Sequence, residues 1–310
     1  MESFKLILSN ETVLTGIRSV PLRTTIPQHR PLIVGLHGST YDSRYFDPDL
    51  RHTAAISSAA FGVPFVSINR PCYGDTSPLP PIPEGSSFPQ ETGSWLHRYA
   101  LPALWLQIGK PNDCNCIVLL SHSLGAMGGI IAAAMHAQNE QSSYPLGGII
   151  ISGLGDNLLP EMIENPAREP NVLPDQVVFP LEIKDAMMFR PGTVHPEMLN
   201  HSKRLDHPSP VAEIASLRDS WLRTWRERWA GFVTVPVMFA LAEQDCFFVG
   251  TEEHVRECTS AFLRSERTDG SLIKGAPHCI ELSYWSQGWY ARCFGFAIEC
   301  SASLALRTGK

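Results

Sequence analysis

The chain has eight cysteines, but none of them stands in the Cys-x-x-Cys spacing of redox motifs and zinc sites. Cys114 and Cys116 enter an apolar segment, and we interpret them as core residues rather than metal ligands. The N-terminus, MESFKLILSNETV, lacks the basic start and long apolar core of a secretory signal. We therefore expect reduced thiols, a cytoplasmic protein, and neither a bound metal nor a cofactor.

An excess of positive charge is also missing. Lys and Arg number 25 against 31 Asp and Glu, which gives a net charge of −6. This balance disfavours a nucleic-acid partner and binding to a membrane surface. The most apolar long stretch, residues 117–137, is interrupted by Ser-His-Ser and three glycines. A strand, a turn and a buried helix explain that stretch better than a membrane span.

Apolar residues make up 44% of the 310 positions and charged residues 18%, so the chain can bury a sizeable core. Two opening strands, FKLIL and VLTGIRSVPL, precede a series of short apolar runs. These runs are RPLIVGL, VPFVSI, NCIVLL, LGGIIIS and VPVMFALA, and GSLIKG closes the series. Helical segments, expected near 46–61, 91–109 and 280–305, alternate with them. This alternation predicts an α/β fold with a mostly parallel sheet covered by helices on both faces.

One segment, residues 157–230, breaks this rhythm because it is rich in Pro, Met, Arg and Glu and contains no clear buried strand. We interpret it as a helical cap inserted into a core formed by 1–156 and 231–310. Near its end, Trp221, Trp225 and Trp229 recur at i, i+4 and i+8, which places them on one helix face. Packing onto the core is the simplest role for this stripe, and contact with a substrate is the alternative.

The sequence VLLSHSLGAMGG, residues 118–129, has the pattern of a strand-to-helix turn that presents a nucleophile. Ser123 stands at its centre, with Gly125 two positions later. Small residues are needed there because the backbone is strained and the helix passes close to the strand. Ser121 stands where glycine is usual, and we interpret it as a small spacer.

Together with three other segments, this turn resembles the α/β-hydrolase superfamily. The segment LHGS, residues 36–39, is similar to the family's oxyanion loop, and INRPCYGDTSP, residues 68–78, to the loop after the next strand. The resemblance implies an oxyanion hole formed by the backbone N–H groups of Ser39 and Leu124. It gives His37, Arg70 and Asp75 the task of fixing these loops.

The acid and the base of the resembling pattern come late in the chain. LAEQDCFF follows an apolar strand and places Asp245 at the family's acid position, and KGAPHCIEL places His278 at the histidine position. The resemblance therefore implies a catalytic triad in the order Ser123, Asp245, His278. Glu243 and Asp156 remain alternatives for the acid.

Several reactive residue types near these motifs have simpler explanations. His122 lies inside the turn, and we expect it to pack beside the nucleophile without transferring a proton. Cys246 and Cys279 follow the acid and the base directly, and we expect both to be packing residues.

A serine triad on this fold implies acyl transfer from an ester, lactone or thioester through an acyl-enzyme. The methionines and aromatic residues of 157–230 favour a medium-sized, largely apolar small-molecule substrate. The chain also resembles stand-alone hydrolases of microbial secondary-metabolite pathways. Two alternatives stay open: a triad-bearing C–C bond hydrolase, lyase or cyclase, and a ligand-binding member of the fold without hydrolytic activity.

Overall fold

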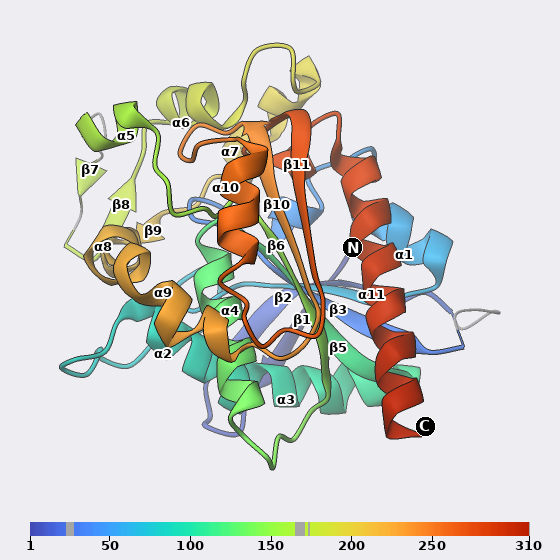
Figure 1. The fold of residues 1–310 in the computed structure, drawn as a ribbon. Helices are drawn as coiled ribbons and strands as arrows, with labels where there is room; N and C mark the ends of the chain where they lie inside the picture. The colour runs from blue at the N-terminus through green and yellow to red at the C-terminus, as the bar shows by residue number, and fades with distance from the viewer. Residues whose placement is uncertain (23–27, 165–170, 173, 310) are drawn as a thin grey trace.

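A single eight-stranded sheet forms the centre of the computed structural model, which describes residues 1–22, 28–164, 171–172 and 174–309 (Figure 1). The strand order is β1-β2-β4-β3-β5-β6-β10-β11. The strands are β1 (Glu2–Ile7), β2 (Val13–Ser19), β3 (Arg30–Leu36), β4 (Phe65–Ile68), β5 (Cys114–His122), β6 (Leu146–Ser152), β10 (Val237–Gln244) and β11 (Thr268–Pro277). The two N-terminal strands pair antiparallel, and all pairs from β4 to β11 are parallel.

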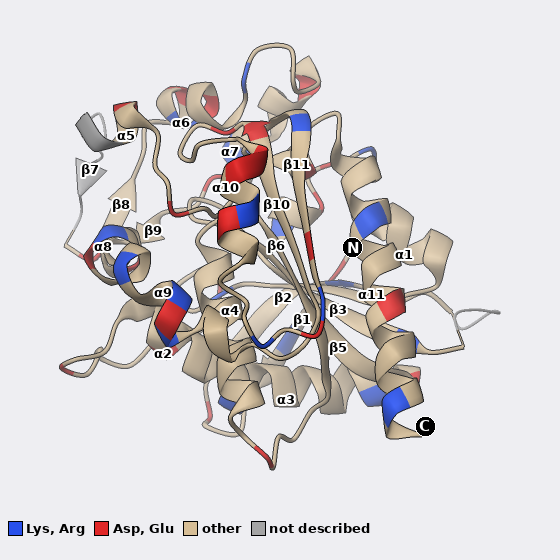
Figure 2. Cartoon of the chain, viewed as in Figure 1, with Lys and Arg blue, Asp and Glu red and all other residues tan. Residues whose placement is uncertain are grey.

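Helices cover both faces of the sheet. On one face lie α2 (Phe88–Trp95), α3 (Leu101–Leu104), α4 (Gly125–Ala137) and α10 (Glu252–Thr259), and on the other α1 (Ala55–Phe61) and α11 (Ser286–Thr308). Alternate residues of the inner strands supply the two apolar layers: Leu119 faces α4, for example, whereas Val118 and Leu120 face α11. The central strands are accordingly almost free of charged residues in Figure 2, where red and blue gather on the outer helices and loops.

The predicted helix 46–61 is wrong in its first half, because α1 begins only at Ala55. Pro48 disfavours a helical conformation of the residue before it. The Asp49 carboxylate accepts the N–H groups of Arg51 and His52 at 2.7 and 2.8 Å, a local turn that competes with a helix. The last helix starts at Ser286, after a 3₁₀ turn over Ile280–Leu282.

Residues 157–230 form short helices and a small antiparallel sheet, which lie above and to the left of the main sheet in Figure 1. The helices are α5 (Pro160–Glu164), α6 (Leu181–Met188), α7 (Ser202–Leu205), α8 (Val211–Ser216) and α9 (Leu222–Arg228); the strands are β7 (Asn171–Val172), β8 (Gln176–Val178) and β9 (Ser209–Pro210). The sequence predicts helices in this segment but does not predict these three short strands. We refer to residues 157–230 as the insertion.

The tryptophan stripe of the insertion packs inward. Trp221 and Trp225 are buried in the apolar layer that also holds α4, and their rings stack at 5.9 Å. Trp225 also lies 6.0 Å from the ring of Phe262 in the core, whereas Trp229 is half-buried. The first two tryptophans thus attach the insertion to the core.

Within the described residues, no helix combines the length and the apolar character that crossing a bilayer requires.

Candidate active site

Ser123 lies at the sharp turn between β5 and α4. Its φ of 49° is in the left-handed region, which non-glycine residues adopt at a cost of about 1–3 kcal/mol when the surrounding structure enforces it. The Ser123 N–H donates to the Ser152 carbonyl of β6 at 2.8 Å. At Gly125, a Cβ atom would lie 2.3 Å from the His37 carbonyl oxygen, so only glycine allows the helix to pass this close. These contacts hold the serine in its strained conformation.

Ser121 points away from this turn. Its hydroxyl is buried, has no hydrogen-bond partner among the described residues, and faces α4, where a Cβ on Gly129 would lie 2.5 Å from it. The structure therefore brings only one of the two serines to the histidine and leaves the other as packing between strand and helix.

Ser123, His278 and Asp245 form a chain of hydrogen bonds. His278 Nε2 lies 3.1 Å from Ser123 Oγ, and His278 Nδ1 lies 2.7 Å from Asp245 Oδ2. The other carboxylate oxygen, Oδ1, accepts the N–H groups of Phe247 and Phe248 at 2.8 and 3.1 Å. With Nδ1 donating to the carboxylate, Nε2 can accept the serine proton. The three residues from three separate strand ends thus have the geometry of a proton relay.

The loop after β3 lies against Ser123. A Cβ on Gly38 would be 2.9 Å from Ser123 Cβ, so glycine is required for this approach. This brings Gly38, the residue before Ser39, against Ser123, while Leu124 is the N-cap residue of α4. His37 is buried, with Nδ1 2.7 Å from the Gly38 carbonyl and Nε2 accepting the Arg70 N–H at 3.3 Å. Burial, and next the charge of Arg70, lower the pKa of His37, so the ring is neutral and holds the loop.

The model of the alpha/beta hydrolase family matches residues 33–289 of this chain. That range covers most of the 310 residues and contains every motif described above. The chain belongs to the alpha/beta hydrolase family.

Solved structures agree with this fold at low sequence identity. An esterase from Thermogutta terrifontis is 15% identical, with a TM-score of 0.61 and coverage of 97% of this chain and 100% of that one. E-2-(acetamidomethylene)succinate hydrolase is 14% identical (TM-score 0.59; 96% and 98% covered). An N-acyl homoserine lactonase is 12% identical (TM-score 0.56; 97% and 98% covered). Comparison with curated proteins gave no match.

Glu243 lies outside the chain of hydrogen bonds from Ser123 through His278 to Asp245. Its carboxylate is exposed, accepts the Gly275 N–H at 2.7 Å and pairs with Lys274 at 3.4 Å. The bond from the Gly275 N–H lowers the pKa of Glu243. Glu243 is thus an exposed residue near the end of β10 that bonds to the neighbouring strand β11.

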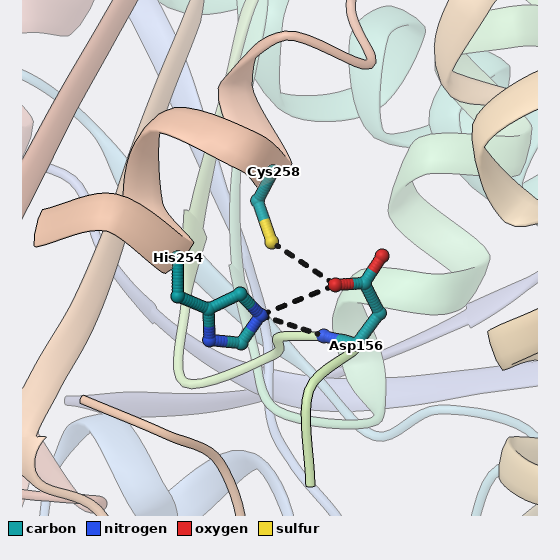
Figure 3. A group of neighbouring side chains, drawn as sticks. All are labelled: Asp156, His254 and Cys258. Carbon is teal, nitrogen blue, oxygen red and sulfur yellow. Dashed lines mark hydrogen bonds and ion pairs between the residues drawn. The ribbon is translucent and has the colours of Figure 1, made fainter. Parts of the chain in front are cut away.

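Asp156, the other alternative acid, has a histidine of its own (Figure 3). Asp156 Oδ1 lies 3.1 Å from His254 Nε2 and 3.6 Å from Cys258 Sγ, both on α10. Its Oδ2 accepts the Trp225 indole N–H at 3.0 Å and Arg226 Nε–H at 2.6 Å, both from α9. Burial acts to raise the pKa of Asp156, but the bonds from His254 and Arg226 outweigh it and lower the pKa. This carboxylate anchors the insertion to the core.

The same three side chains offer a carboxylate, an imidazole and a thiol within 4.8 Å, a donor set that zinc could use. Their atoms are already engaged. His254 Nδ1 faces the Val249 carbonyl at 2.8 Å, and Nε2 faces the Asp156 carboxylate at 3.1 Å. With the Arg226 guanidinium on the same carboxylate, a second cation does not fit.

His122, inside the elbow, packs beside the triad as the sequence predicts. Its ring stacks on Tyr45 at 4.8 Å, lies 5.0 Å from the His278 ring and bonds to Ser152 Oγ at 3.0 Å. Burial, and next the charge of His278, lower the pKa of His122 and keep it neutral.

Sequence reasoning missed Glu281, which is fully buried beneath His122. It accepts bonds from Tyr45 Oη at 2.7 Å, Trp289 Nε1 at 2.8 Å and Ser152 Oγ at 3.1 Å. The only sequence signal for this residue is that Glu281 is the single charged residue in the otherwise apolar segment CIEL, residues 279–282.

Cys246 and Cys279, the two cysteines beside Asp245 and His278, are buried, and burial has the largest effect on the pKa of each thiol. Burial raises the pKa of Cys279 to about 12, and burial followed by the Asp245 charge raises that of Cys246. Because the thiolate is the reactive form, both are unreactive at neutral pH.

Cys72 is half-buried, and the other seven cysteines are buried. We expect Ellman's reagent at pH 8 to titrate about one thiol in the native protein and all eight in guanidinium chloride. Hydrolase activity should survive the native treatment. Rapid reaction at Cys246 or Cys279, located by peptide mapping, would contradict this assignment.

Proposed function

We propose that this protein is a serine hydrolase that cleaves an ester, lactone or thioester through an acyl-enzyme on Ser123. The observation that carries the proposal is the continuous chain from Ser123 Oγ through His278 to Asp245, with distances of 3.1 and 2.7 Å. A serine hydroxyl is a poor nucleophile without a base, and this geometry supplies one.

In the proposed reaction the same side chains and N–H donors act in both acylation and deacylation. Ser123 Oγ attacks the acyl carbon while its proton passes to His278 Nε2, and the tetrahedral oxyanion accepts bonds from the N–H groups of Ser39 and Leu124. Collapse expels the alcohol or thiol, which takes the proton from His278. Water then attacks the acyl-enzyme with His278 as base, which releases the acid and restores Ser123. Asp245 stabilises the imidazolium in both halves.

An enclosed, partly apolar setting supports a medium-sized, largely apolar acyl substrate. Ser123 is only 8% exposed, and the half-buried Phe247 ring lies edge-on to His278 at 4.8 Å. Met188 and Phe189 of the insertion instead pack with Tyr41 in the core, so they are part of the apolar packing around the site. The esterase and lactonase among the similar structures act on bonds of this class.

A direct test is labelling with a fluorophosphonate followed by peptide mapping, alongside turnover of p-nitrophenyl butyrate, a lactone and a thioester. We expect stoichiometric modification at Ser123 and turnover of at least one acyl substrate. A Ser121→Ala variant should be labelled as the wild type is. A protein that is neither labelled nor active on any of these substrates would favour the non-hydrolytic alternative.

A further inference from the structure

The carbonyl of Gly38 is held by two donors, His37 and Arg70. His37 Nδ1 lies 2.7 Å from this oxygen, and Arg70 Nη2 donates to it at 3.1 Å. The Gly38 carbonyl and the Ser39 N–H belong to one planar peptide unit, where they point in opposite directions in the usual trans form. Fixing the carbonyl therefore also fixes the direction of the Ser39 N–H.

Arg70 itself is held by a residue of the insertion. Its guanidinium makes a two-pronged ion pair with Glu213 of α8, and the side chains are only 1% and 2% exposed. The Tyr73 hydroxyl donates to the same Glu213 carboxylate. All of these groups are buried, so the pair has one geometry and little freedom to adopt another.

A second contact reaches the same loop from the strand before α8. Ser209 Oγ of β9 accepts the Thr40 N–H at 2.8 Å and lies 2.7 Å from Ser39 Oγ. Ser209 is fully buried. Two residues of the insertion, four positions apart, thus hold both sides of the Gly38–Ser39 peptide.

We propose that Glu213 and Ser209 are positioning residues that orient the Ser39 N–H toward the reacting acyl group, so that docking of the insertion assembles the oxyanion hole. This inference rests on the proposed hydrolase function and extends it. Glu213 acts through Arg70, and Ser209 acts directly on the loop. Neither touches the substrate.

Stability alone is a weak reason for such a pair. Replacing a buried ion pair with apolar residues of similar volume is often neutral or stabilising, whereas removing one partner leaves an unpaired buried charge. The double variant Arg70→Met/Glu213→Leu therefore separates the two roles. The double variant removes the Arg70 donor to the Gly38 carbonyl, together with the Glu213 carboxylate that holds it, and leaves the His37 donor in place. It leaves no unpaired charge, so we expect it to fold.

The test measures kcat and KM for p-nitrophenyl butyrate, together with the inhibition constant of phenylboronic acid, whose tetrahedral Ser123 adduct places an anionic oxygen in the oxyanion hole. In the double variant we expect kcat to fall about 10- to 100-fold with KM nearly unchanged, and boronate affinity to weaken in parallel. Ser209→Ala should do the same to a smaller extent.

The matched control is Asp156→Asn/Arg226→Gln, which removes a different ion pair between insertion and core without touching the oxyanion loop. We expect its kcat and boronate affinity to stay near those of the wild type. Unchanged kcat in a folded Arg70→Met/Glu213→Leu variant, or equal losses in the control, would overturn the inference while leaving the hydrolase intact. An inactive, unlabelled wild type would overturn both.

Discussion

Replacing Ser123 with alanine is expected to lower kcat/KM for p-nitrophenyl butyrate by about 10⁴- to 10⁶-fold, the range seen when a triad serine is removed. The substitution deletes the only hydroxyl that faces His278 Nε2, at 3.1 Å, among the described residues. Any residual rate would come from water attack in the intact oxyanion hole. Steady-state kinetics and fluorophosphonate labelling measure the two effects independently.

Folding should not be the cause of that loss. Alanine keeps the Cβ atom and removes none of the backbone contacts of the elbow. The melting temperature should therefore stay within a few degrees of that of the wild type. Ser121→Ala is the matched control, because this hydroxyl is buried without a partner among the described residues. Retained activity in Ser123→Ala, or labelling that moves to Ser121, would refute the assignment of the nucleophile.

Replacing Asp245 with asparagine is expected to lower kcat by about 10⁴-fold, with a smaller effect on KM. The amide keeps the shape of the carboxylate but can present an N–H to His278 Nδ1. That favours the ring tautomer with the proton on Nε2, which cannot accept a proton from Ser123. The Phe247 and Phe248 N–H groups would still hold the side-chain oxygen.

Two isosteric variants distinguish the three acids. Glu243→Gln and Asp156→Asn should each keep kcat within a few-fold of the wild type, because neither carboxylate contacts His278 in the structure. Asp156→Asn should instead lower the melting temperature, since Arg226 loses its ionised partner. A large kcat loss in either variant, with Asp245→Asn active, would show that the acid was misassigned.

The fold could be predicted from sequence because its signals are local. Apolar strand runs, the glycines around Ser123 and the order of the motifs each lie within a short segment, and their order matches one family pattern. The carboxylate that pairs with His278 was harder to predict. Asp156 and Asp245 both follow parallel strands, so both reach the same edge of the sheet. Only the structure shows that Asp156 meets His254 while Asp245 meets His278.

The supporting residues could not be predicted, because their partners are distant in sequence. Glu213 lies 143 positions from Arg70, and Glu281 lies 236 from Tyr45. No periodicity distinguishes such a buried carboxylate from a solvated one on the surface of a short helix. The first half of the helix predicted over 46–61 failed for the opposite reason: a local turn at Asp49 competes with the helix there.

The place of His278 in the sheet has a consequence for biosynthesis. It follows β11, the outermost strand, and lies 155 positions after the serine it serves. During translation the elbow can form on β5 and β6 long before its base emerges from the ribosome. Under the proposed mechanism, the nascent chain therefore carries Ser123 without a proton acceptor, and hydrolytic competence arises only once the last strand has docked on β10. Proposed in this way, catalysis is a late product of folding, because it depends on a contact of high sequence separation.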